Sequence, residues 1–489
     1  MAGSATAAGT AGASQGAKGT ITNPSGSPPP VKFPAQFGSL KLPQKFPDGT
    51  HISITQWSHF VPRYDKWFDA YAQQWGKANN VKITVQHISY ADLNSTLAAA
   101  IAAKKGPTLM QLNATPAAFI QGLQPLNDVN EAAEAKWGQG VKPCTHQTYL
   151  PTKKEWYAYC EGWVVDPGDY RISLWKAAGY PNGPVTYEDL LKGGQKIYQK
   201  TGIPVGVGMS PEIDSEFYAR TLIWSFGGQV QNACGKVTLD SKPVVDAVKY
   251  QKKLFQSAET PEVFSWNAAS NNQAFVSGRA SYIQNSISFY RTAQQSNPKV
   301  AEDTGFRPGL KGPTGQVHQT AHVWFIYVLP KYVTNKEQVL AAKKFLLDLT
   351  ANYASDTFYS KLYDFPAYPP TVPQLSKWVE HDPWGSNPPD KLAVLNTALK
   401  WTAWPGYPGY ANPAISEVYN TFLISTMMAQ AARGEKSPEQ AVKDTTAQVE
   451  RIAEKWKKMG YVGCSGNGTT AAAGGSTHGS RSTSGSKSK

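Results

Sequence analysis

Long apolar runs and blocks of one charge are both missing from this 489-residue sequence. No stretch approaches the roughly eighteen uninterrupted apolar residues that a membrane helix needs, so we expect a soluble body. The net charge is +13, from 48 basic and 35 acidic side chains. Residues 1–48 and 464–489 each hold +3 of this excess. Because the remaining sequence shows no Arg/Lys block, the distribution argues against nucleic-acid binding.

Motifs of catalysis and metal binding are also lacking. We find no HExxH or P-loop pattern, no GxSxG pattern within residues 49–463, and no pair of carboxylates in a context suited to glycoside hydrolysis. His318 and His322 have a metal-like spacing only on a helix, which the segment VHQTAHVW is not expected to form. We therefore expect no catalytic residue, no metal site and no cofactor.

Cysteine is scarce, with four in the chain and no CxxC pair that would indicate zinc or redox chemistry. Cys144 and Cys160 flank a short segment that contains a proline, and this spacing predicts a local disulfide. Cys234 and Cys464 are far apart in sequence. Pairing in an oxidising compartment is the simplest interpretation, and four unrelated thiols are the alternative.

The two ends of the chain differ from its body in composition. Residues 1–48 are rich in Ala, Gly, Ser, Thr and Pro, and residues 464–489 in Gly, Ser and Thr, which predicts a disordered tether and a disordered tail. The first segment lacks the charged start and apolar middle of a signal peptide, as expected for a chain without its export signal or a lipoprotein without its lipidated start. Removal of residues 1–45 and 468–489 should leave stability unchanged.

Strand and helix patterns alternate in the body, which at this length should form two domains. Apolar positions predict strands at 51–57, 81–88, 108–112, 280–284 and 323–329. They predict helices near 66–78, 93–101, 187–200, 214–225, 243–257, 336–350, 414–433 and 438–458. This order predicts an α/β fold with mostly parallel sheets, whose ligands gather beyond the carboxyl ends of the strands.

Several motifs follow one another along residues 50–462. They are VKITVQHI, KKGPTLMQLNA, LQPLND, EWYAYCEGW, LWKAAGYPNGPVTYEDLL, WSFGG, GKVTLDSKPVVDAVKYQKKL and QAFVSGRASYIQNS. Their order resembles the extracellular solute-binding proteins of ABC importers, specifically the maltose-type (family 1) sugar-binding family. The chain departs from the family pattern at Thr108, where Asp is usual, at Ser281 and Tyr282, where Ala-Met is usual, and in DPGDYRISLW.

The resemblance implies a two-lobed, periplasmic-binding-protein-like fold, with a mostly parallel sheet flanked by helices in each lobe and a hinge of two or three crossing segments. Lobe 1 would comprise residues 49–160 and 300–349, and lobe 2 residues 161–299 and 350–463. Cys234 and Cys464 would then belong to the same lobe, which favours their pairing. The implied function is that of a monomeric extracytoplasmic receptor, periplasmic or on the cell surface, with or without a lipid anchor. It would bind a sugar or oligosaccharide, close by hinge motion and deliver the sugar to the permease subunits of an ABC importer.

Candidate ligand contacts lie at strand ends, beside the inferred hinge, in the helix before WSFGG and in an aromatic loop. Aromatic plates suit the C–H faces of sugars and polar groups suit their hydroxyls. The candidates are Trp57, His59, Asn113, Trp163, Asp214, Phe217, Asn285, Tyr290, Trp324, Trp404 and Tyr407. Each has a structural alternative, such as an N-cap for Asp214 or a core position for Phe217.

The candidate positions lack a cluster of Arg and Lys and lack several carboxylates, so we expect a neutral sugar. Replacing Trp163 or Trp404 by Ala should weaken binding by roughly 1–3 kcal/mol and change stability much less. Two other functions fit the aromatic positions, a cell-surface carbohydrate adhesin and a carbohydrate-active enzyme. Hydrolysis of oligosaccharides would favour the enzyme, and binding without lobe closure would favour the adhesin.

Overall fold

Apolar side chains at strand and helix spacing form the first elements of the chain. The computed structural model describes residues 28–34, 37–38 and 40–464. Strand β1 (His51–Trp57) is followed by helix α1 (Arg63–Asn79), whose aromatic face is buried. On this face Trp75 packs edge-on against Phe345 of α12 (Lys336–Ala351), with the ring centroids 5.3 Å apart. The predicted first strand and helix are thus joined to a helix from late in the chain.

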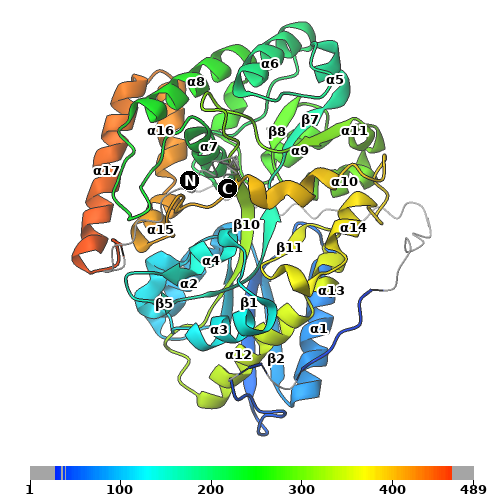
Figure 1. Cartoon of the computed structure of the whole chain (residues 1–489), viewed down its shortest axis with the longest axis vertical. Coiled ribbons are helices and arrows are strands. Elements are labelled where there is room, and N and C mark those ends of the chain that lie inside the picture. Colours follow the sequence, from blue (N-terminus) through cyan, green and yellow to red (C-terminus); the bar gives the residue numbers. More distant parts are fainter. Residues whose placement is uncertain (1–27, 35–36, 39, 465–489) are drawn as a thin grey trace, which may run out of the picture.

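The larger sheet occupies the lower half of the molecule in Figure 1, with strand order β11-β6-β10-β3-β1-β2 and with β12 beside β10. Its further strands are β2 (Lys82–Ile88), β3 (Leu109–Leu112), β6 (Tyr159–Val165), β10 (Gln319–Val328), β11 (Asp364–Pro366) and β12 (Thr402–Ala403). β1 pairs in parallel with β2 and β3, whereas β10 is antiparallel to β3 and β6. The helices of this half are α2 (Leu93–Ala103), α3 (Asn127–Trp137), α4 (Lys142–Thr148), α13 (Tyr353–Tyr359) and α14 (Leu375–Glu380), with the small pair β4 (Tyr149–Leu150) and β5 (Glu155–Trp156).

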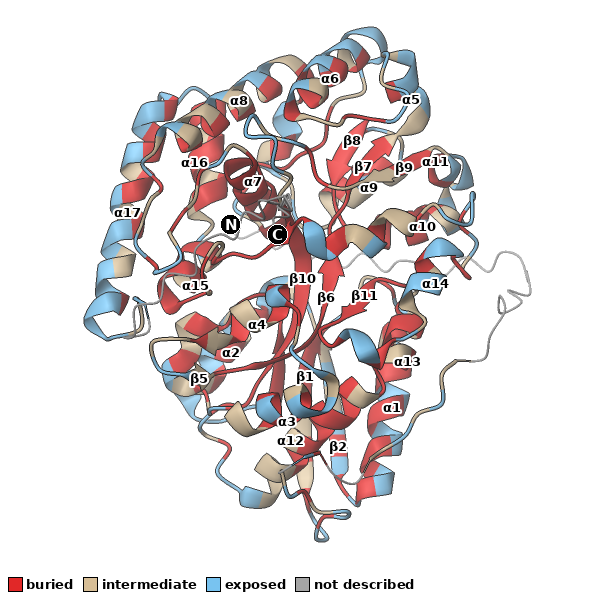
Figure 2. Ribbon diagram, viewed as in Figure 1, coloured by how far each residue is buried: buried red, intermediate tan, exposed pale blue. Residues whose placement is uncertain are grey.

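The smaller sheet lies in the upper half and has the order β8-β7-β9. Its strands are β7 (Gly168–Arg171), β8 (Tyr282–Gln284) and β9 (Thr304–Arg307). Both pairings of β7 are antiparallel, so the mostly parallel arrangement predicted for each lobe is found around β1 and not around β7. The helices of this half are α5 (Ile172–Ala177), α6 (Tyr187–Thr201), α7 (Ile213–Ser225), α8 (Lys242–Ala258), α9 (Ser270–Val276), α10 (Ser288–Ser296), α11 (Pro298–Glu302), α15 (Pro413–Asn420), α16 (Leu423–Ala432) and α17 (Pro438–Lys458). Buried residues follow the strands of both sheets and the inner faces of these helices (Figure 2).

Three segments connect the two halves. Residues 166–167 join β6 to β7, residues 308–318 join β9 to β10, and β12 leads from the lower half toward α15. The predicted lobe boundaries need three corrections. Residues 161–165 belong to β6 of the larger sheet although they were assigned to lobe 2. β9 lies in the smaller sheet although residues 300–349 were assigned to lobe 1, and β11 pairs with β6 although residues 350–463 were assigned to lobe 2. The chain stays in the lower half after α12 because the β11–β6 pairing holds it there.

The predicted tether is wrong for its described part. Phe37, Leu42 and Phe46 are all buried in the larger core, at 0%, 7% and 2% exposure. Asn352 binds the backbone of Lys32 on both sides, since its Oδ1 accepts the Lys32 N–H and its Nδ2 donates to the Lys32 carbonyl, both at 2.7 Å. We call the described residues between 28 and 46 the N-terminal strap. The predictions for residues 1–27 and 465–489 lie outside the described residues.

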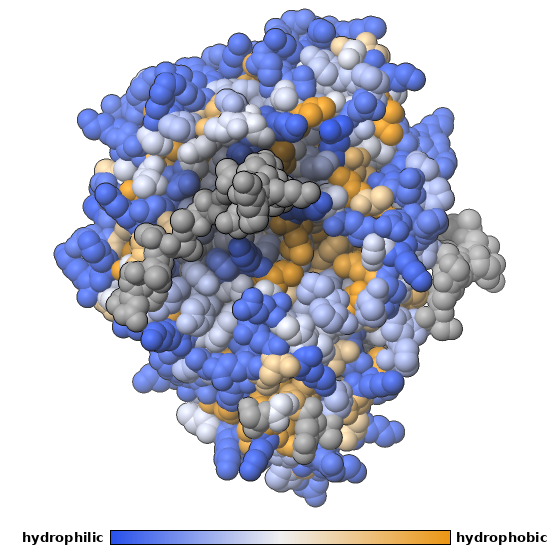
Figure 3. Space-filling view, in the orientation of Figure 1, coloured by the Kyte–Doolittle hydropathy of each residue, from blue (hydrophilic) through white to orange (hydrophobic). Residues whose placement is uncertain are grey.

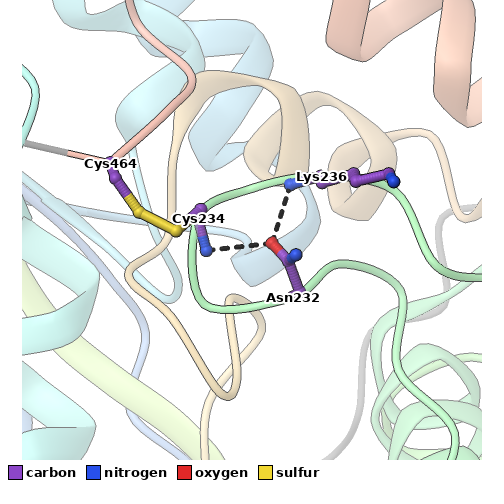
Figure 4. Close-up of a disulfide and its surroundings, with 4 residues drawn as sticks. All are labelled: Asn232, Cys234, Lys236 and Cys464. Carbon is purple, nitrogen blue, oxygen red and sulfur yellow. Dashed lines mark hydrogen bonds between the residues drawn. A yellow bond between two sulfur atoms is a disulfide. The ribbon is translucent and has the colours of Figure 1, made fainter. Parts of the chain in front are cut away.

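A disulfide joins Cys234 to Cys464, as lobe membership favours, with their Cα atoms 4.7 Å apart. Cys234 lies in a turn that Asn232 organises, since the Asn232 Oδ1 accepts the backbone N–H groups of Cys234 and Lys236 at 2.9 and 3.0 Å (Figure 4). The bond therefore ties the segment that follows α17 to a turn 230 residues earlier.

The predicted Cys144–Cys160 disulfide is not formed, and both thiols are free and buried. Cys160 lies in β6, in the middle of the larger sheet, and its Sγ donates to the carbonyl of Gly162 at 3.2 Å. Burial raises the pKa of the Cys144 thiol well above its usual value. Because thiol exchange proceeds through the thiolate, burial disfavours oxidation at this pair.

Thiol labelling tests this assignment. Alkylation of the unreduced, denatured protein is expected to modify Cys144 and Cys160, and proteolysis is expected to release one disulfide-linked peptide pair that contains Cys234 and Cys464. Mass spectrometry of the digest provides the measurement. A linked peptide pair that contains Cys144 and Cys160 would contradict the assignment.

Candidate functional site

Aromatic side chains of the larger sheet gather where its strands end near the upper half. The indole of Trp57, the last residue of β1, stacks on the His59 ring at 4.9 Å and contacts the Tyr90 ring at 5.4 Å. β3 ends nearby at Leu112, and the carbonyl of Asn113 accepts the backbone N–H of Trp324 at 3.0 Å. The edge that the sequence predicted to gather ligand contacts is therefore built from Trp57, Asn113 and Trp324.

Helix α7 brings the second half of the molecule onto this edge. The Phe217 ring lies 6.2 Å from Trp324 and 5.8 Å from Tyr419 of α15. α15 itself contacts the lower half, because the Ser416 hydroxyl donates to the Thr115 carbonyl at 2.8 Å. We call Trp57, Tyr90, Phe217, Trp324 and Tyr419 the interlobe aromatic cluster. The face in Figure 3 is hollowed between the two halves, with apolar residues along the hollow.

Polar atoms of this cluster are buried without partners. Among the residues that the structure describes, Trp57 Nε1, Tyr90 Oη, Trp324 Nε1 and Tyr419 Oη make no hydrogen bond. A buried donor without a partner costs about 1–3 kcal/mol, so several of them at one place need an explanation. Burial raises the pKa of the Tyr90 hydroxyl well above its usual value, and the nearby Tyr419 and Asp214 add to the effect. All four groups are therefore un-ionised donors at neutral pH.

Carboxyl groups adjoin the cluster at the start of α7. Burial raises the pKa of Glu212 to about 8 and that of Asp214 to about 6. The Glu212 carboxylate caps the helix by accepting the N–H groups of Asp214 and Ser215. Asp214 accepts from the Asn271 Nδ2 at 2.8 Å. Glu212, and not Asp214, is therefore the N-cap of α7. The Asp214 carboxyl does not have the capping role that was the structural alternative for this residue.

The first crossing segment contacts β10 beside these carboxyls. Asp166, between β6 and β7, accepts from Gln284 at 2.7 Å and lies 3.3 Å from the Nδ1 of His322 in β10. Burial lowers the pKa of His322, but the charges of Asp214 and Asp166 outweigh burial, and the pKa lies above its usual value. An ionisable pair therefore lies at the junction of the two halves.

Several predicted site residues make other contacts. His59 is fully engaged, since its Nδ1 accepts the Val61 N–H at 2.9 Å and its Nε2 lies 3.1 Å from Asp364, and burial lowers its pKa to about 3. Trp404 is buried, and its Nε1 donates to the Gly409 carbonyl at 2.6 Å. The ligand-contact role of these residues stays a prediction.

The remaining candidates are buried or half-buried. Trp163 packs edge-on against Phe365, with the ring centroids 5.9 Å apart. The Tyr290 hydroxyl donates to Ser386 at 3.0 Å. Asn285 is fully buried, with its backbone N–H on Asp169, and Tyr407 contacts the Trp404 ring. Trp163 of β6 is the register partner of Trp324 in β10 and therefore lies beside the interlobe aromatic cluster. The proximity of Tyr290, Asn285 and Tyr407 to the cluster stays a prediction.

Tyr90 and Tyr419 are the cluster members that sequence reasoning missed. Tyr90 follows β2 by two residues, so the rule that selected Trp57 at the end of β1 also applied to it. Tyr419 lies inside a segment predicted to be a continuous amphipathic helix, where an aromatic residue on the apolar face resembles any core residue. Its role becomes visible only once α15 is placed against the larger sheet.

A second group of buried carboxyls surrounds Glu161 of β6. Glu161 is fully buried, and neither of its carboxyl oxygens has a hydrogen-bond partner among the described side chains and backbone. Burial raises its pKa well above the usual value, and the charges of Asp356 and Asp364 add to the effect. A carboxyl whose pKa rises on folding stabilises the protein below its unfolded pKa, about 4.3, and that contribution is lost as the pH rises.

Replacing Glu161 by Gln is therefore expected to raise the melting temperature at pH 8 and to change it little at pH 5. The measurement is the melting temperature of both proteins across this range. Glu131→Gln on the exposed surface of α3 is the matched control and should show no such pH-dependent difference. A Glu161→Gln protein that is less stable than wild type at pH 8 would show that the carboxylate is held by a favourable partner.

Metal-binding clusters and membrane-spanning helices are both absent from the described residues. Residues 28–34, 37–38 and 40–464 contain no group of three or more His, Cys, Asp or Glu side chains that could hold a metal ion. None of the described helices combines the length and the apolar character needed to cross a bilayer.

Comparison with known proteins gives consistent results. A family model described as bacterial extracellular solute-binding protein matches residues 61–354. Among curated proteins, a binding protein of Brucella abortus is 24% identical over 179 residues, which are 36% of this chain and 43% of that protein. An ABC transporter-binding protein of Deinococcus radiodurans is 25% identical over 175 residues, 34% of this chain and 42% of that protein. The match thus spans less than half the length of these relatives.

Solved structures share the fold. The maltose-bound MalE3 of T. maritima superposes with a TM-score of 0.68 at 20% identity, over 83% of this chain and 100% of that chain. A sugar transporter from Arthrobacter chlorophenolicus with bound laminaribiose gives a TM-score of 0.67 at 17% identity, over 82% and 99%. The predicted two-lobed α/β fold class is confirmed, and these neighbours are binding proteins and not enzymes.

Proposed function

Because the chain belongs to the family of bacterial extracellular solute-binding proteins, we propose that it captures a sugar or oligosaccharide between its two lobes and delivers it to an ABC importer. The extracytoplasmic location fits the Cys234–Cys464 disulfide, since such bonds persist in oxidising compartments. Hinge motion about the three crossing segments would close the lobes on the sugar.

The interlobe aromatic cluster carries the proposal. Trp324 and Tyr419 are at most 2% exposed, yet Trp324 Nε1 and Tyr419 Oη have no hydrogen-bond partner among the described residues. The two side chains come from different elements, β10 and α15, and both lie against the Phe217 ring. Donors held in this way beside flat apolar rings match a ligand that has C–H faces and hydroxyl oxygens.

Neighbouring structures support the same ligand class. The T. maritima protein holds maltose and the Arthrobacter protein holds laminaribiose. Identities of 20% and 17% support a shared fold rather than a shared ligand, so the sugar class is inferred from the cluster and the neighbours together.

A thermal-shift screen against mono- and oligosaccharides tests the proposal. A ligand that binds only the folded protein stabilises it by about 2.7 kcal/mol at one hundred times its dissociation constant. At least one sugar is expected to raise the melting temperature in a saturable way. If no carbohydrate does so, while a phosphate, dicarboxylate or peptide ligand does, the proposed function is wrong.

A further inference from the structure

The junction of the two lobes holds more carboxyl groups than cations. Asp166, Asp169, Glu212 and Asp214 are all buried or nearly so, and they come from the first crossing segment, from β7 and from the start of α7. The sequence argument for a neutral ligand rested on the absence of several carboxylates at the predicted site. The fold corrects this premise of a site without several carboxylates. It brings together four carboxyl groups from residues that are up to 48 positions apart in the sequence.

Cations of the protein do not balance these groups. Among the ion pairs of the described residues, Asp166 pairs with His322, and none includes Asp169, Glu212 or Asp214. Arg220 of α7 is nearby, but its guanidinium is committed to Glu216, with Nη2 2.9 Å from Oε1. The His322 imidazolium, which already pairs with Asp166, is also the cation that acts on Asp214, so two carboxylates share one positive charge.

Asp214 is the carboxyl that faces the interlobe aromatic cluster. Asp214 precedes Phe217 by three residues on α7, so the two side chains share one face of the helix. Burial and then the charge of Glu216 raise the pKa of the Tyr419 hydroxyl, Arg220 lowers it, and Asp214 adds to the increase. Asp214 also contributes to the raised pKa of Tyr90, which lies in the opposite lobe. The unpartnered Tyr419 Oη and Trp324 Nε1 thus share their surroundings with Asp214, a buried carboxyl that has no counter-charge of its own because it shares His322 with Asp166.

Burying a carboxylate without a counter-charge is costly, and a bound cation recovers that cost. A small amine alone would leave the buried aromatic donors unused. A ligand that combines a ring with hydroxyls and a protonated amine satisfies both sets of groups.

We propose that the solute is a basic sugar, one that carries a protonated amine, and that its ammonium group pairs with Asp214 while its ring and hydroxyls meet the interlobe aromatic cluster. This inference rests on the proposed carbohydrate-binding function and narrows it to amino sugars and their glycosides.

Sugars that differ in one substituent test the inference. Calorimetric titration at pH 7, above the Asp214 pKa of about 6, compares D-glucosamine with D-glucose and N-acetyl-D-glucosamine, and the β-1,4-linked glucosamine trimer with cellotriose and the fully N-acetylated trimer. Each set changes an ammonium to a hydroxyl or an acetamide on the same ring. We expect the amine to bind about tenfold tighter than either neutral analogue at low salt, and the advantage to shrink at 0.5 M salt as the charge is screened.

Variants test the assignment to Asp214. Asp214→Asn keeps an oxygen for the Asn271 contact and should remove most of the amine advantage. Asp246→Asn, on the exposed surface of α8, is the matched control and should preserve the advantage. The wild-type comparison and its salt dependence decide the inference even if Asp214→Asn does not fold.

The possible results distinguish a failure of the basic-sugar inference from a failure of the proposed carbohydrate-binding function. Neutral analogues that bind as tightly as the amines, or amines whose advantage survives Asp214→Asn unchanged, overturn the basic-sugar inference and leave a carbohydrate receptor. A protein to which neither these six sugars nor any other carbohydrate binds overturns both.

Discussion

A chain that begins at residue 47 is expected to be less stable than one that begins at residue 28 by about 5 kcal/mol. The N-terminal strap places Phe37, Leu42 and Phe46 in the larger core. Each such side chain contributes about 1.5–3 kcal/mol when it is fully buried, and realistic denatured states reduce the total. Loss of the two hydrogen bonds between Lys32 and Asn352 adds to the effect. Urea denaturation of the two chains measures the difference.

Point variants separate the strap from a general effect of truncation. Phe46→Ala should cost about 3–5 kcal/mol, as expected for a large buried aromatic residue. Leu399→Ala is the matched control, because Leu399 is 52% exposed and its loss should change the unfolding free energy by less than about 0.5 kcal/mol. Equal stability of the two chains would mean that the strap does not dock.

Replacing Arg220 by Leu is expected to cost about 3–5 kcal/mol, because Glu216 would remain buried without its counter-charge. Glu216 is 0% exposed and Arg220 is 1% exposed. Their pair also joins separate elements, since Glu216 accepts the Ser425 N–H of α16 at 2.9 Å and Arg220 donates to the Pro405 carbonyl at 3.3 Å. Urea denaturation of the variant and of wild type measures the cost.

The double variant Glu216→Leu with Arg220→Leu should be more stable than Arg220→Leu alone, since it removes the unpaired charge. Lys242→Ala is the surface control, because its pair with Asp246 is solvent-exposed and contributes at most about 0.5 kcal/mol. An Arg220→Leu protein as stable as wild type would contradict the account of the pair.

The local periodicity of apolar residues predicted most of the helices and strands. The order of the sequence motifs predicted the family. Helix α17 spans Pro438–Lys458, where the sequence predicted 438–458, because a single amphipathic face repeats over its whole length. The same holds for α6, whose start is marked by the capping box of Thr186 and Asp189. The predicted family and fold class are confirmed on this basis.

Features set by distant contacts could not be predicted in this way. The apolar residues of the N-terminal strap are diluted by Pro, Gly and Lys, so composition suggested a tether, whereas packing against the larger core decides the outcome. β11 has three residues and no periodicity of its own, and its place beside β6 fixed the lobe boundary. Cys144 and Cys160 are close in sequence, but the core holds each as a buried thiol.

The candidate site was predictable only in part, because local sequence patterns do not show which distant segments come into contact. Trp57 and Trp324 followed from strand positions and Phe217 from the family resemblance. Tyr419 lies 362 residues from Trp57, and no local pattern connects the two. Trp404 lies in the predicted aromatic loop but is only 6% exposed, so its replacement by Ala should lower stability as well as any affinity, in contrast to the small change in stability that the sequence predicted.

The central claim is that a sugar is held by the interlobe aromatic cluster, and calorimetric titration of two matched tyrosine variants tests it most directly. Tyr419→Phe and Tyr218→Phe each remove one buried hydroxyl that has no partner among the described residues. Tyr419 belongs to the cluster, whereas Tyr218 lies in the core of the upper half. With the best sugar from the screen, Tyr419→Phe should weaken binding by about 0.5–1.5 kcal/mol and Tyr218→Phe should bind like wild type. Unchanged affinity in Tyr419→Phe, or an equal loss in both variants, would contradict the account.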